Sequence, residues 1–290
     1  MTITEHRQAI RAAERTGEGL RVLFGRMGTA EHPRGAILSA YRSSRRALRD
    51  VMRREGAMRL VEGVQVLAGL RAEVDEIAHG MLVQAQELGM EQAEREAGIY
   101  GLVAPRVRIF EGIQAAHAAW MGPVEAQIAG ARAALAMDWD EGMVVGDEER
   151  VGLLNPSVAT REGARWLAIA ALLGWIAVVG GGARRAPVSF MRQAVAAIDE
   201  RTTDCCLRVH GQVVGLRRDF ELTGTPRYAD RLRDPPFHWY CRTSVCLVRA
   251  EDADDELSQQ LREAGRAELE ARDRTGERRE IHPAHGRSRR

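Results

Sequence analysis

Apolar residues recur at three- and four-residue steps over a long stretch in the first third of the chain. The series is Leu60, Val64, Leu67, Leu70, Val74, Ile77, Met81, Ala85 and Leu88. This spacing returns to one face of an α-helix, so we predict a single helix of about eight turns, roughly 40 Å long. A helix of that length does not bury its stripe alone. It packs in a helical bundle or pairs with a partner's helix, as a rod for association.

Two further helices are predicted around it. Residues 36–55 carry one apolar face, formed by Ile37, Tyr41, Leu48 and Met52. Arginines at three- and four-residue steps share another face of that helix, namely Arg42, Arg46, Arg49 and Arg53. This stripe is a candidate contact for DNA phosphates, or else a solvated face whose charge Asp50 and Glu55 dilute. A third, alanine-rich helix is expected from about Ile109 to Met137, with a break or kink at Gly122-Pro123.

The composition excludes several classes of site. With 42 basic and 41 acidic residues the net charge is +1, so total charge indicates neither a dedicated nucleic-acid binder nor an acidic-ligand binder. Every one of those basic residues is arginine. Without lysine there is no Walker-type phosphate loop, no Schiff-base lysine and no lysine-dependent kinase site. The N-terminus has no apolar run of the signal-peptide type, so we expect no Sec-dependent export.

An acidic segment over residues 138–160 is predicted to be a connection with at most one short element. The most apolar run follows at residues 166–180. A membrane span needs about 20 such residues, so a buried helix, or a helix leading into a strand, is favoured over a membrane-active segment. We therefore expect no stable membrane anchor. Gly180-Gly181-Gly182 does not have the spacing of a dinucleotide-binding loop.

From Val188 the pattern changes to short strand-like pieces at residues 190–198, 212–216 and 244–250. A helix is expected after Glu251, because leading acids suit a helix N-terminus and Leu257, Leu261 and Leu269 form a thin apolar stripe. The last residues are polar and expected to be disordered. The predicted fold is α+β and predominantly α. It comprises a helical region over 1–160, a small mixed module with a short β-sheet over 161–250, and a C-terminal helix and tail over 251–290.

Cysteines and histidines cluster in the predicted module. Cys206 and His210 lie four residues apart, and His238 and Cys241 lie three apart. Two such pairs can supply the four ligands of a tetrahedral structural zinc ion. Two other interpretations remain open. One is a reduced, buried cysteine cluster with His238 hydrogen-bonded to the backbone, and the other is a Cys206–Cys241 disulfide formed outside the reducing cytoplasm.

The residues around these two ligand pairs are predicted to have structural and not catalytic roles. Asp199, Arg201 and Thr202 follow a strand-like run and could cap turns or pair with Arg242, since an aspartate–arginine contact can be bidentate. Pro235-Pro236 fixes two successive φ angles and holds the preceding chain extended, which suits a rigid approach to the second ligand pair.

This arrangement resembles the Mu F-like head-morphogenesis proteins of tailed bacteriophages over about sixty residues. The family pattern is D-x-R-T, a cysteine, a turn ending in glycine, a variable loop and P-P-x-H-x-x-C-R. The matching residues are Asp199, Arg201, Thr202, Cys206, Gly211, Pro235, Pro236, His238, Cys241 and Arg242. Many members carry a C-x-x-C where this chain has Thr203-Asp204-Cys205-Cys206, which puts a family-like four-ligand metal site in doubt.

The resemblance implies a minor head protein, present in few copies and needed for head assembly or DNA delivery. Its implied partners are the portal protein, the major capsid or scaffold proteins and packaged DNA. The implied location is the virion, in the capsid interior or near the portal, and the host cytoplasm during assembly.

The two alternatives to a head protein are a nuclease and a DNA-binding scaffold. An HNH-type metal-dependent nuclease would need two C-x-x-C knuckles or an Asp-His pair, and the chain has neither. A plain DNA-binding scaffold would use the arginine stripe. A nucleophile elbow, an HExxH motif and a kinase motif set are all absent, so no enzymatic activity is expected.

Overall fold

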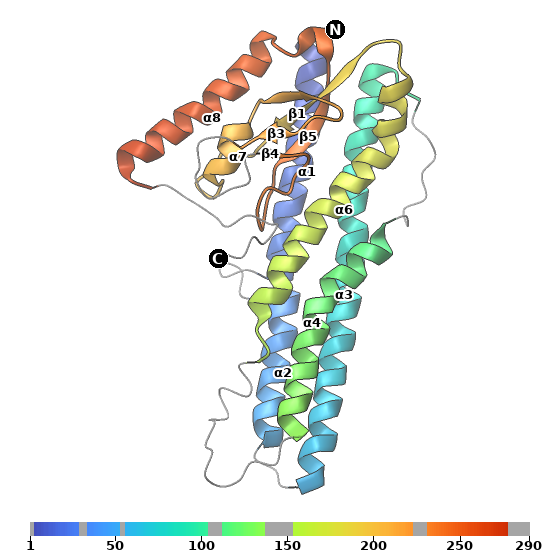
Figure 1. Ribbon diagram of the computed structural model, residues 1–290, viewed down its shortest axis with the longest axis vertical. Coiled ribbons are helices and arrows are strands. Elements are labelled where there is room, and N and C mark those ends of the chain that lie inside the picture. Colours follow the sequence, from blue (N-terminus) through green and yellow to red (C-terminus); the bar gives the residue numbers. More distant parts are fainter. Residues whose placement is uncertain are drawn as a thin grey trace.

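A computed structural model of the chain describes residues 3–28, 34–52, 56–103, 112–136, 153–222 and 231–277. Long helices form an elongated bundle, and a small sheet with a C-terminal helix lies against one end of it (Figure 1). The bundle helices are α1 (Ile3–Met27), α2 (Ala36–Met52), α3 (Gly56–Tyr100), α4 (Ile113–Ala136) and α6 (Pro156–Arg185). The expected class, α+β and predominantly α, is confirmed.

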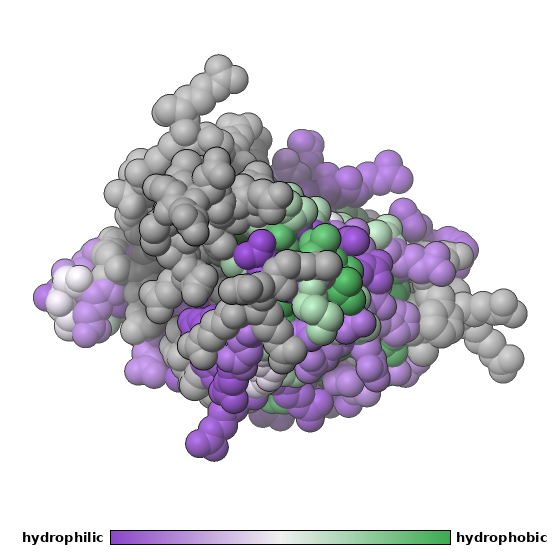
Figure 2. All heavy atoms as spheres, turned by 90° about the horizontal axis from the view of Figure 1, so that it is seen from below, coloured by the Kyte–Doolittle hydropathy of each residue, from purple (hydrophilic) through white to green (hydrophobic). Residues whose placement is uncertain are grey.

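The predicted long helix is α3, which continues past the apolar stripe to Tyr100. Leu67, Leu70 and Val74 of the stripe are fully buried against the other bundle helices. The stripe is therefore covered within the chain. Of the two predicted alternatives, packing in a helical bundle is confirmed for this part of α3, and pairing with a partner's helix is not. The start of the stripe remains uncovered, and the end of the bundle shows a small apolar patch among polar surface (Figure 2). The exposed apolar side chains there are Met58, Leu60 and Val61.

The other two predicted helices differ from expectation only in detail. In α2 the residues Ile37, Tyr41 and Leu48 are buried, which confirms the apolar face. Pro123 lies inside α4 and does not end it. The predicted start of that helix and Met137 lie outside the described residues, as do Arg53 and most of the acidic segment 138–160.

The apolar run 166–180 forms the middle of α6, a helix of 30 residues. Asn155 caps it, because its side chain accepts a hydrogen bond from the Ser157 amide at 3.0 Å. By length and composition α6 is apolar enough to cross a membrane, yet 56% of its most apolar window is buried inside the protein. This matches the predicted buried helix. The predicted boundary at residues 160 and 161 falls inside α6, and Gly180-Gly181-Gly182 is helical.

Three strands form an antiparallel sheet in the order β2-β1-β5. They are β1 (Phe190–Val195), β2 (Val213–Gly215) and β5 (Ser244–Arg249), and each lies within a segment predicted to be strand-like. A second pair, β3 (Phe220–Glu221) and β4 (Arg231–Leu232), is also antiparallel. Helix α8 (Glu256–Thr275) follows the 3₁₀ turn η1 (Ala250–Asp252). Asp255 is its N-cap, and its side chain accepts a hydrogen bond from the Ser258 amide at 2.7 Å.

Side chains of α3 form hydrogen bonds with the backbone groups at the open edge of β5. Gln92 donates to the Val245 carbonyl at 2.6 Å, and Tyr100 donates to the Leu247 carbonyl at 2.7 Å. Between them, Glu96 accepts from the Leu247 amide at 2.9 Å. Residues four apart on a helix face one way, so these three side chains take the place of a neighbouring strand. The bundle and the sheet are thereby joined through buried polar contacts.

The N-terminal helix is joined to the sheet and to α8 in the same manner. His6 of α1 is fully buried, with Nδ1 2.8 Å from Oδ2 of Asp255 and Nε2 2.7 Å from Oε1 of Gln193. The amide nitrogen of Gln193 donates to Ser258 Oγ at 2.9 Å, which orients its oxygen toward His6. The predicted disorder after α8 concerns residues that mostly lie outside the described part.

Candidate metal centre

The first half of the motif is a tight turn that leads into a short helix, α7 (Asp204–Val209). Oδ1 of Asp199 accepts hydrogen bonds from the Arg201 amide at 2.9 Å and from the Thr202 hydroxyl at 3.0 Å. Arg201 contributes its backbone, and its side chain is exposed. The turn delivers Cys205 and Cys206 into the buried first turns of α7.

The second half is the segment from Asp234 to Arg242, which is anchored at both ends. Asp234 forms an ion pair with Arg192, a nearly buried residue of β1. Tyr240 has a positive φ of 58° and donates from its hydroxyl to Thr160 Oγ1 at 3.1 Å. A left-handed residue reverses the chain sharply, which allows His238 and Cys241 to face the same neighbour.

That neighbour is Cys206. Its sulfur lies 3.0 Å from Nε2 of His238 and 3.8 Å from the sulfur of Cys241. Ligand atoms of Cys205, Cys206 and His238 all lie within 4.8 Å of one another, so this group could hold a metal ion. All of the cysteines are reduced and buried.

The tautomer of His238 follows from its other ring nitrogen. Nδ1 lies 2.5 Å from the Trp239 carbonyl, which can only accept, so Nδ1 donates there. The Nε2 lone pair then points at Cys206. This is the form that accepts a thiol proton or binds a metal ion. The backbone hydrogen bond belongs to the interpretation as a reduced cluster, and it equally orients a ligand.

His210 does not join this group, although the sequence predicted it as a ligand. Its Nδ1 accepts a hydrogen bond from the Ala196 amide at 3.0 Å, and burial lowers its pKa to about 4. The physical reason is that α7 ends at Val209. His210 therefore leaves the helical path, and the four-residue spacing from Cys206 no longer aligns the two side chains. Cys205, which was not among the predicted ligands, lies in the group instead.

Gly211 closes this turn with a φ of +74°. A Cβ at this position would lie 2.7 Å from the Arg262 amide nitrogen of α8. The glycine in the motif is thus required both by its left-handed backbone and by close packing against α8.

An ion pair is a second contact between the two halves of the motif, beside that of Cys206 with His238. Arg242 donates to both carboxylate oxygens of Asp199, at 2.7 and 2.6 Å. Chiefly these hydrogen bonds hold the pKa of Asp199 well below its usual range, against an opposing effect of burial. Such a bidentate pair fixes the mutual orientation of both segments.

A third arginine, Arg272, enters the site from α8 and was missed by the sequence analysis. It is buried, and it donates to the Thr202 carbonyl at 2.5 Å and the Asp199 carbonyl at 2.9 Å. It also lies 3.2 Å from the buried carboxylate of Asp204. A signal was available, because Arg272 continues the three- and four-residue steps of Leu261 and Leu269 on the buried face of α8.

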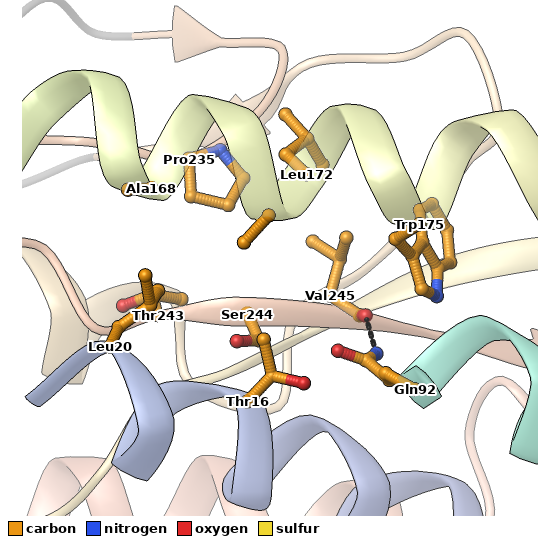
Figure 3. Close-up of a pocket in the computed structure, with 11 residues that line it drawn as sticks. Thr16, Leu20, Gln92, Ala168, Leu172, Trp175, Pro235, Thr243, Ser244 and Val245 are labelled. Atoms are coloured by element: carbon orange, nitrogen blue, oxygen red, sulfur yellow. Dashed lines mark hydrogen bonds between the residues drawn. The ribbon is translucent and has the colours of Figure 1, made fainter. Parts of the chain in front are cut away.

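The thiols are kept neutral by their surroundings. Burial raises the pKa of Cys206 well above its usual range and that of Cys241 to about 12. A hollow of only about 10 Å³ reaches Cys206 and His238. A second cavity of about 20 Å³ lies between α1, α6 and β5, beside the hydrogen bond from Gln92 to Val245 (Figure 3). Each has room for about one water molecule and not for an organic substrate.

The chain was compared with family models, curated proteins and solved structures. None of the three comparisons finds a match. The likeness to the Mu F-like proteins therefore rests on the motif residues described above.

Proposed function

We propose that this chain is a minor head protein of a tailed bacteriophage or prophage that acts by binding near the portal. The proposal is supported by one observation above all. The two halves of the motif, separated by about thirty residues, contact each other through Cys206 with His238 and through Asp199 with Arg242. A motif whose distant parts meet behaves as one structural unit, as expected if the whole pattern is inherited from a family.

The geometry favours binding over catalysis. A cysteine nucleophile acts as an exposed thiolate, whereas Cys206 is buried and its pKa is raised. The nuclease alternative needs a histidine that reaches a substrate water as general base. His210 and His238 are each only 4% exposed, and both use Nδ1 in hydrogen bonds with the backbone.

Association with the portal tests the proposal. We expect the purified chain to co-purify with portal oligomers encoded in the same genome, and not with portal oligomers from an unrelated phage. It should show no cleavage of DNA when Mg²⁺, Mn²⁺ or Zn²⁺ is added. Metal-dependent cleavage that disappears in His238→Ala, with no portal association, would favour the nuclease instead.

A structural zinc ion is part of this proposal. Cys205, Cys206 and His238 form the group of close ligand atoms, and Cys241, which lies beside Cys206 but outside that group, is proposed as the fourth ligand. Two thiolates at about 2.3 Å from a tetrahedral zinc ion lie roughly 3.8 Å apart. The Cys206 and Cys241 sulfurs have this separation, 3.8 Å. Three thiolates and one histidine form a common closed structural site. A bound cation would also offset the cost of ionising buried thiols.

Elemental analysis of protein purified without chelator should find about one zinc ion per chain. Cys241→Ser should lose most of the metal, because it removes one of the four ligands. Cys246→Ser is the matched control, since Cys246 lies on β5 beside Gln193 and outside the group. Metal-free protein whose melting temperature is unchanged by zinc or by a chelator would leave the reduced thiol cluster as the correct interpretation.

A further inference from the structure

Helix α2 presents a polar, basic face to solvent at the end of the bundle remote from the small sheet (Figure 1). Its apolar face packs inside the bundle, where Ile37, Tyr41 and Leu48 are buried. The exposed positions of α2 are, in full, Ser39, Arg42, Ser43, Arg46, Arg49 and Asp50. The outward face therefore contains hydroxyl, guanidinium and one carboxylate group, and no exposed apolar side chain.

Positive charge is concentrated on this helix. From Ala36 to Met52 there are four arginines and one acidic residue, whereas the whole chain has a net charge of only +1. The same excess, four arginines against one acidic residue, is spread over the 30 residues of α6, so α2 with 17 residues carries positive charge at the higher density.

Some arginines elsewhere in the bundle have carboxylate partners, whereas the exposed Arg7, Arg11 and Arg15 of α1 have none among the described residues. Arg21 pairs with Glu18, Arg71 with Glu125 and Arg95 with Glu91, at N···O distances of 2.5, 2.8 and 3.4 Å. Arg46 and Arg49 are also exposed and have no ion-pair partner among the residues that the structure describes. Within that part of the protein no carboxylate neutralises their guanidinium groups.

We propose that the α2 face formed by Arg42, Arg46 and Arg49 binds the phosphate backbone of nucleic acid. Arg42 and Arg49 are seven residue steps apart, which corresponds to roughly 10 Å at a rise of about 1.5 Å per residue. Phosphates follow one another every 3.4 Å or so along the axis of each DNA strand, so several lie within that reach. An anionic membrane is a poorer fit, because interfacial helices insert apolar side chains and this face has none. The inference does not depend on the proposed head-protein function.

Binding is tested with a short duplex DNA of mixed sequence, by fluorescence anisotropy over a range of salt concentrations. We expect affinity that falls steeply with salt and that does not depend on sequence. The double variant Arg46→Glu/Arg49→Glu should bind roughly tenfold more weakly or worse, and its slope against log salt should fall by about 2. Circular dichroism should be unchanged, since both side chains are exposed.

The matched control is Arg71→Glu/Arg95→Glu, which makes the same change in net charge at arginines that already have carboxylate partners. It should retain most of the binding. The proposal is overturned if both double variants lose binding equally, if the α2 variant binds like the unmodified chain, or if vesicles of anionic phospholipid are bound while DNA is not. Because portal association is measured separately, either idea can fail without the other.

Discussion

Replacing Arg272 with alanine is expected to lower the free energy of unfolding by about 3–5 kcal/mol, the range found when one partner of a buried ion pair is removed. Arg272 is buried on α8, and its guanidinium is bonded to two backbone carbonyls and lies 3.2 Å from the carboxylate of Asp204. Asp204 is itself fully buried. Without Arg272 the Asp204 carboxylate loses the guanidinium beside it, and the Thr202 carbonyl loses its donor from α8, while the Asp199 carbonyl keeps only the hydrogen bond from the Thr202 amide.

Urea denaturation of the unmodified chain and of two variants would measure the effect. Arg266→Ala is the control, because Arg266 is an exposed arginine of the same helix and its loss should change stability by less than about 0.5 kcal/mol. If Arg272→Ala and Arg266→Ala unfold at the same urea concentration, Arg272 does not anchor the motif turn to α8. A loss confined to Arg272→Ala would locate the anchor of the turn in α8.

The local elements could be predicted from sequence because their signals are local. The three-four steps from Leu60 to Leu88 lie within α3, and the strand-like segments contain β1, β2 and β5. Each depends on residues close together in the chain, where periodicity reports directly on which face is buried. The leading acids before α8 likewise mark its start, since Asp255 is the cap.

Contacts between distant segments could be predicted only where both partners belonged to the recognised motif. The pair Asp199 and Arg242 was considered for that reason. Arg272 and Glu96 were not predicted, because a charged residue in an amphipathic helix is ordinarily solvated. The spacing of Arg272 from Leu269 could have placed it on the buried face of α8, but spacing does not identify a partner more than forty residues away. The prediction of His210 as a metal ligand is wrong for a related reason. Residue spacing does not reveal that the short helix α7 ends at Val209, before His210.

The buried carboxyl group of Glu96 makes stability depend on pH at the junction between α3 and β5. Burial, opposed by hydrogen bonds from Gln92 and the Leu247 amide, raises its pKa from 4.5 to about 8. Because the folded state holds this proton more tightly than the unfolded state does, the contribution is complete below pH 4.5 and declines as the pH rises toward 8. The decline amounts to about 1.4 kcal/mol per pH unit at most.

His210 makes stability depend on pH in the opposite direction, so its effect must be distinguished from that of Glu96. Its pKa is lowered from 6.5 to about 4, so its contribution is complete above pH 6.5 and declines as the pH falls toward 4. Between pH 4.5 and 6.5 the two effects oppose each other. Of these two groups only Glu96 changes between pH 6.5 and 8, so its contribution is measured in this window.

In that window the chain should lose up to about 2 kcal/mol of unfolding free energy, measured by urea denaturation at pH 6.5 and at pH 8. Glu96→Gln should be less stable than the unmodified chain at pH 6.5, because a glutamine amide cannot accept from both Gln92 and the Leu247 amide, yet its stability should not fall further by pH 8. Glu91→Gln, at an exposed position of the same helix, should keep the full pH dependence. An equal slope in all three proteins would mean that Glu96 is already ionised at pH 6.5. The α3–β5 junction would then be an ionic one, in which the carboxylate is stabilised by its two hydrogen-bond donors despite its burial.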